Sequence, residues 1–129
     1  MDKESIPRNK IHNFIRKTIN NIDELPNINF YSLIFFTLVL VDRFSFEQHR
    51  LQYLARIDLT INIFEFVLEC LVEKGFLNNK VRIEICKIFN LRKAELPLLL
   101  ETYMRAEDNI LHFNVHKKKR SFLSRFCIR

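Results

Sequence analysis

The stretch Ile61–Phe89, INIFEFVLECLVEKGFLNNKVRIEICKIF, decides the expected fold class because it predicts two helices joined by a tight turn. Apolar side chains recur at helical spacing on both sides of Gly75, and a glycine directly after such a run is typical of a helix C-terminus. We therefore expect one helix over residues 61–74 and another over residues 78–89. The apolar stripe of the second helix comprises Val81, Ile85, Ile88 and Phe89.

Two helices are expected before this pair. The first covers residues 8–21 and carries Ile11, Phe14, Ile15 and Ile19 at helical spacing. The second is capped by Asn27 or Asn29 and ends near Asp42. Its polar residues are only Tyr31, Ser32 and Thr37.

Two more helices complete the expected set. Residues 43–57 predict a short third helix with Leu51, Tyr53 and Leu54 as its apolar side, after which Asp58 or Thr60 would cap the helix over residues 61–74. A sixth helix starts near Ala94, where Pro97 is acceptable because it lies in the first turn. Its expected apolar positions are Leu98, Leu99 and Leu100.

The composition favours an all-α protein of one domain. Among 129 residues there are one glycine and three prolines, too few for the turns of a hairpin-rich β fold. Hydrophobic residues make up 48% of the chain, which is enough for a core. We expect a six-helix antiparallel bundle over residues 1–107 and a flexible basic tail over residues 108–129, where the helical pattern fades.

The net charge of +6 belongs to the tail. Residues 1–115 hold 15 basic and 15 acidic side chains, whereas residues 116–129 hold six Lys/Arg and no acid. A neutral body argues against a dedicated nucleic-acid-binding domain, which needs a basic face for phosphate groups. The alternative of a small helical nucleic-acid-binding protein stays open. Its contacts would be the helix over residues 78–89 and the run Lys117, Lys118, Lys119 and Arg120.

No pattern typical of an enzyme is present. A single glycine excludes the glycine-rich loops that bind nucleotides, and no Ser or Cys lies in a recognisable nucleophile motif. His112, His116 and Cys127 could suggest a metal site, but a structural zinc site needs a fourth ligand. We therefore expect neither enzymatic activity nor a metal or other cofactor.

Apolar and cysteine patterns bear on the compartment. The apolar run over residues 30–41 has about a dozen residues, whereas a membrane span needs about 20, so we expect a buried helix and no membrane span. Cys70, Cys86 and Cys127 form an odd set without paired spacing, which indicates a reducing, cytoplasmic compartment. The basic tail leaves a nuclear address open.

Two surfaces of opposite charge are expected on the paired helices. Glu65, Glu69 and Glu73 stand four residues apart and share one helix face, although each like-charged neighbour pair costs about 0.2–0.5 kcal/mol. The following helix and its exit are basic, with Lys80, Arg82, Lys87, Arg92 and Lys93. Exposure to solvent is a sufficient explanation for either the acidic or the basic residues taken alone. Together they form unlike surfaces that a second copy could complement in an open-ended assembly.

The apolar second helix supplies a further expected contact. A bundle of about 100 residues has little room to enclose one helix completely. We therefore expect Phe35 or Phe36 to be partly exposed and available to a partner.

The order of these segments resembles a death effector domain over roughly residues 10–105. FYSLIFF, residues 30–36, is similar to the second helix of that family, and Phe35 falls at its exposed apolar patch. NIFEFVLECLVEKGFLNNKVRIEICKIF, residues 62–89, resembles the fourth helix, the turn and the fifth helix.

The resemblance also covers KAEL, Lys93–Leu96, which stands where the family has an Arg-x-Asp-Leu motif. It implies that Lys93 and Glu95 belong to a surface charge network and that the leucines after them are core. Asn29 stands where the family has an acid, and lysine lacks the bidentate geometry of arginine, so the network would be rearranged.

The resemblance implies a module that self-associates and binds other death-effector-domain proteins, such as an adaptor or an initiator caspase, in apoptotic or innate immune signalling. The surface of helices one and four would meet that of helices two and five on the next copy. Two rival readings stay open. One is a survival-type helical protein whose groove takes an amphipathic helix, and the other is a closed dimer through the apolar second helix.

Overall fold

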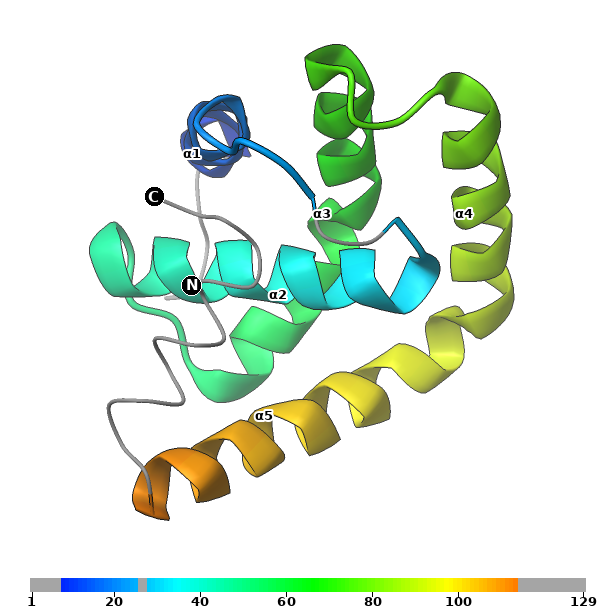
Figure 1. Ribbon diagram of the computed structural model, residues 1–129. Coiled ribbons are helices and arrows are strands. Elements are labelled where there is room, and N and C mark those ends of the chain that lie inside the picture. The colour runs from blue at the N-terminus through cyan, green and yellow to red at the C-terminus, as the bar shows by residue number, and fades with distance from the viewer. Residues whose placement is uncertain (1–7, 26–27, 114–129) are drawn as a thin grey trace.

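The computed structural model describes residues 8–25 and 28–113, and side chains as far as residue 106. These residues form helices and no strand (Figure 1), which confirms the all-α class. The helices are α1 Arg8–Asn20, α2 Phe30–Glu47, α3 Tyr53–Lys74, α4 Asn79–Arg92, the 3-10 turn η1 Lys93–Glu95 and α5 Leu96–Phe113. No helix among the described residues is long and apolar enough to cross a membrane.

Helix α2 forms the centre of the bundle. Figure 1 shows it across the middle of the molecule between α1 and α5, with α3 crossing it. Its apolar sequence is explained by burial on nearly every side, because α1, α3 and α5 all contribute to the same core. The buried residues of α2 are Phe30, Leu33, Ile34, Phe36, Thr37, Leu38, Val39, Leu40, Val41, Phe44 and Ser45.

Helix α2 continues past Asp42, so the predicted end near that residue is wrong. No glycine or proline interrupts the chain there. The side chain of Arg43 donates to Glu47 at 2.8 Å, an i,i+4 pair that supports the last turn. Burial of the Phe44 side chain in the core further stabilises this extension of the helix.

The predicted third helix over residues 43–57 is also wrong as a separate element. Its first part belongs to α2 and its last part to α3, and the Ser45 hydroxyl accepts a hydrogen bond from the Leu51 N–H at 2.8 Å across the link. Thr60 does not cap a helix, because its hydroxyl donates to the Arg56 carbonyl at 2.7 Å within α3. Arg56 also reaches Asp42 at 3.1 Å and thereby joins α3 to α2.

Local signals set the other helix ends. The Asn29 side chain accepts from the Ser32 N–H at 3.0 Å, which confirms it as the cap of α2. The Asn78 side chain accepts from the Val81 N–H at 2.8 Å and caps α4. Gly75 ends α3 with φ of 93°, a left-handed conformation that glycine adopts without the cost other residues incur.

Helix α5 buries one side of its leucine run. Leu96 and Leu100 lie in the core with Met104, at i, i+4 and i+8. Leu98 points the other way and is 70% exposed, so its expected core position is wrong. The helix extends to Phe113, past the boundary expected after residue 107.

Candidate interaction surface

Helices α1 and α3 run side by side in the same direction. The His12 ring stacks on Phe66 with centroids 3.8 Å apart, and the ammonium of Lys74 donates to the Asn20 carbonyl at 2.9 Å. Both contacts join residues 54 positions apart, so the two helices keep one register over two turns. We call the line of contact between these two helices the α1–α3 seam. It places the solvent side of α3 beside a row of basic residues on α1.

The three predicted glutamates lie on that solvent side of α3. Glu65, Glu69 and Glu73 are all exposed, and Asp58 continues their stripe toward the start of the helix. None of these four carboxylates forms an ion pair with any other described residue. We call these four residues the acidic stripe.

The pKa of His12 reflects the charges around the stripe. Partial burial lowers the pKa of His12, as do the guanidinium groups of Arg8 and Arg16, whereas Glu69 opposes them. Arg16 also lies 5.3 Å from the centroid of the Phe66 ring. The acidic stripe is therefore flanked by cations on α1 that leave its carboxylates without a direct partner.

Burial disfavours the thiolate form of both cysteines near the stripe. Burial raises the pKa of Cys70 to about 11 and also raises that of Cys86. A thiol held protonated is a poor nucleophile and a poor metal ligand. Among the described residues no group of three His, Cys, Asp or Glu could hold a metal ion.

Helix α4 presents the opposite charge. Lys80 and Lys87 are exposed, and neither forms an ion pair with a described residue. Ile83 and Leu91 share their face at spacings of three and four residues, and Leu91 is 83% exposed. We call these four residues the lysine face. Its two apolar members were missed because the sequence reasoning followed the buried stripe of the same helix.

The other predicted basic positions lie elsewhere. Arg82 is half-buried, and its Nε donates to the Asn79 side chain at 3.3 Å. Lys93 places its ammonium 5.4 Å from the centroid of the Phe89 ring. Lys93 and Glu95, which the resemblance places in a surface charge network, are both exposed, and Glu95 pairs with Arg92 at 3.5 Å.

The two phenylalanines predicted on α2 have different environments. Phe36 is fully buried, so its expected place on an interaction surface is wrong. Its helix position turns it into the core beside Val39 and Leu40. Phe35 is half-buried, and its ring stacks on Tyr103 of α5 with centroids 4.3 Å apart. Most of the apolar patch expected at Phe35 is therefore covered by the chain itself.

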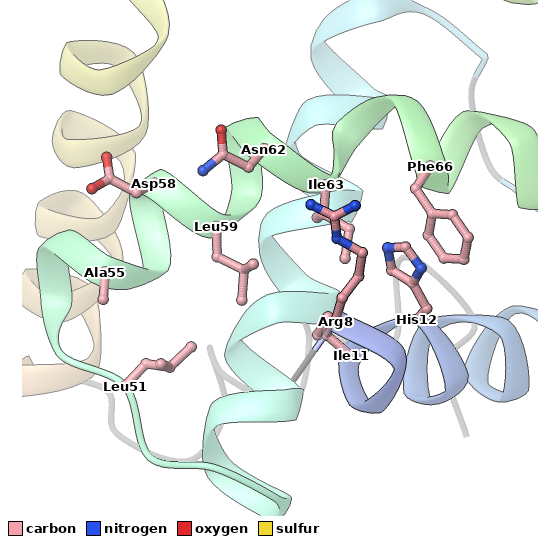
Figure 2. A pocket seen from close by; sticks show the side chains of 10 residues that line it. All are labelled: Arg8, Ile11, His12, Leu51, Ala55, Asp58, Leu59, Asn62, Ile63 and Phe66. Carbon is pink, nitrogen blue, oxygen red and sulfur yellow. The ribbon is translucent and has the colours of Figure 1, made fainter. Parts of the chain in front are cut away.

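A groove opens between α1 and the first half of α3. Its cavity has a volume of about 590 Å³. Ile11, Leu51 and Ile63 are buried in its floor, and Arg8 of α1 and Asp58 of α3 also line it (Figure 2). Sequence reasoning missed this groove, because its walls come from α1, the α2–α3 link and α3.

The remaining predicted residues lie outside the described side chains. These are His112, His116 and Cys127, considered for a metal, and the basic run Lys117, Lys118, Lys119 and Arg120. Comparisons of the chain with models of protein families, with curated proteins and with solved structures find no match.

Proposed function

We propose that this chain is a non-enzymatic protein-interaction module of the death-effector type, which assembles through contacts between helices. Its partners are further copies of itself and other death-effector-domain proteins, such as an adaptor or an initiator caspase. Its role is to assemble or modulate caspase-activating complexes in apoptotic or innate immune signalling.

One observation carries the proposal: neighbouring helices carry two exposed faces of opposite charge that form no ion pairs with the described residues. The acidic stripe on α3 and the lysine face on α4 form no ion pairs with the described residues, although both helices belong to one bundle. A second copy can place its lysine face against the stripe of the first. Because the two faces differ, each added copy exposes a new one, which favours open-ended growth.

The charged and the apolar side chains contribute binding free energies of different size. An exposed ion pair contributes about 0.2–1 kcal/mol, so two or three such pairs do not hold copies together. Burying Ile83 and Leu91 against a partner contributes about 1.5–3 kcal/mol for each fully covered side chain. The apolar side chains therefore supply most of the affinity, and the charges set orientation and specificity.

The helix count bears on the type of death fold. The resemblance implies six helices, whereas here the residues expected in the third helix are divided between the end of α2, the α2–α3 link and the beginning of α3. We attribute this variant to Arg43, Phe44 and Ser45, which extend α2 through an ion pair and burial. The proposed surfaces lie on α3 and α4 and do not depend on a separate third helix.

Charge reversal tests the proposal in the full chain. Sedimentation velocity over a concentration series should show open-ended growth of the wild type and at least tenfold weaker association of Glu69→Lys and of Lys87→Glu, each measured alone. An equimolar mixture of the two variants should restore growth, because each variant's altered face then meets the altered face of the other. Glu24→Lys, an exposed change outside α3 and α4, is the matched control.

Two results would reject this function. One is a wild-type monomer at every concentration. The other is growth that the single reversals leave unchanged, which would assign association to another surface. A mixture that fails to recover would show that the two faces do not meet each other.

A further inference from the structure

The groove between α1 and α3 has the size of a binding site. Its volume of about 590 Å³ lies within the range of about 300–1,000 Å³ typical of ligand sites. Its floor is apolar, with Ile11, Leu51 and Ile63 already buried, and Leu59 and Phe66 contribute half-buried apolar surface. An occupant must therefore offer apolar side chains of its own.

The walls of the groove select the charge of that occupant. Figure 2 shows Arg8 and His12 on α1 and Asp58 and Asn62 on α3. The acidic stripe continues from Asp58 along the solvent side of α3, next to the groove. A bound segment with cationic side chains would place them beside Asp58 and the rest of the acidic stripe, because Arg8 repels cations at its own position in the groove.

The chain itself contains a segment of this chemistry. Residues 114–129 combine Phe122, Leu123 and Phe126 with six Lys/Arg and contain no acid. This segment follows α5, which ends at Phe113. Sixteen residues can span up to about 50 Å when extended, which exceeds the diameter expected for a domain of about 100 residues. Its length therefore suffices to reach the groove.

We infer that residues 114–129 bind in this groove, with their apolar side chains on its floor and their basic side chains along the acidic stripe. Bound there, the segment covers the carboxylates that the lysine face of a second copy would use. It then competes with self-association from within the same molecule. The inference that the segment binds is drawn from the groove and from the composition of the segment. Only the inference that it competes with self-association rests on the proposed function.

Tethering makes even weak binding effective. A segment joined by a short linker has an effective concentration on the order of 1 mM. If the free segment binds with a dissociation constant of about 0.1 mM, about nine molecules in ten are closed. Self-association then weakens by roughly tenfold, so loss of the segment's apolar residues should strengthen it by the same factor.

Paramagnetic relaxation in the full chain tests the inference. A nitroxide is attached to Cys127 of a Cys86→Ala variant, because buried Cys70 has a thiol pKa of about 11 and reacts slowly. At a concentration where the chain is monomeric, amide signals of the groove residues Leu59 and Asn62 should broaden, and those of α4 should not. The double substitution Phe122→Asp and Phe126→Asp should remove the broadening and leave the helical circular dichroism unchanged.

Three outcomes would overturn the inference. The first is an absence of broadening in the groove, and the second is broadening that survives the double substitution. The third appears in a mixture of isotope-labelled chains and separately spin-labelled chains, where broadening between molecules would identify a second copy as the occupant. Sedimentation of the same variants tests the competition separately, so a failure of self-association would leave the result on binding interpretable.

Discussion

The contact between Phe35 and Tyr103 gives the sharpest prediction about stability. The two rings join α2 to α5 across 68 positions of sequence, with a centroid distance of 4.3 Å and an interplanar angle of 21°. Sequence reasoning assigned Phe35 to an exposed patch, whereas this geometry makes it part of the fold. The substitutions Phe35→Ala, Tyr103→Ala and their combination distinguish the two roles.

The size of the effect follows from burial. Replacing a fully buried phenylalanine by alanine costs about 3–5 kcal/mol, and the half-buried Phe35 should cost about 2 kcal/mol. Tyr103 is also half-buried and should cost a similar amount. An aromatic pair contributes about 0.5–1.5 kcal/mol beyond its buried area, and either single substitution already removes this contribution. The loss of unfolding free energy in the double variant should therefore be about 0.5–1.5 kcal/mol smaller than the sum of the two single losses.

Chemical denaturation followed by circular dichroism measures these free energies of unfolding. Each single substitution should also lower Tm by roughly 10 °C, given about 4–8 °C per kcal/mol for a domain near 100 residues. Strict additivity of the two losses would refute the stacked contact. A Phe35→Ala variant of wild-type stability that no longer associates would return Phe35 to the interaction surface.

Two further predictions concern the α2–α3 link and the α1–α3 seam. Ser45→Ala should lower the free energy of unfolding by about 1–3 kcal/mol in urea titrations, because the buried Leu51 N–H loses its acceptor; a change near zero would contradict that role. Because the pKa of His12 is lowered, the folded state binds a proton at this side chain less tightly than the unfolded state does. Neutral His12 therefore contributes to the stability of the folded state above pH 6.5, and this contribution is lost as pH falls through the folded-state pKa. Wild type should therefore lose more stability between pH 7 and pH 5 than His12→Phe, and equal losses in the two proteins would exclude His12 as the cause.

Much of the local structure could be predicted because its causes lie within a few residues. The cap at Asn29 and the left-handed Gly75 depend on hydrogen bonds and φ angles of adjacent residues. The first helix followed from its apolar spacing, and the exposure of Glu65, Glu69 and Glu73 followed from the cost of burying carboxylates. No distant partner enters these inferences.

The predictions that failed had two causes. The predicted end of the second helix near Asp42 is wrong because Arg56 of α3 pairs with Asp42 and the side chain of Phe44 is buried in the core, so α2 continues. The core position that the resemblance implies for Leu98 is wrong because the helical period of α5 turns this residue outward. Only the first of these depended on contacts between distant segments.

The helical class, the ends of several helices and the charge of their faces follow from the amino-acid sequence alone. These properties arise from backbone hydrogen bonding and from spacing along one helix. Contacts between distant segments place Tyr103 over Phe35 and enclose a groove between α1, the α2–α3 link and α3. Burial and cavities depend on contacts between segments far apart in the chain, and the spacing within one segment does not specify its neighbour.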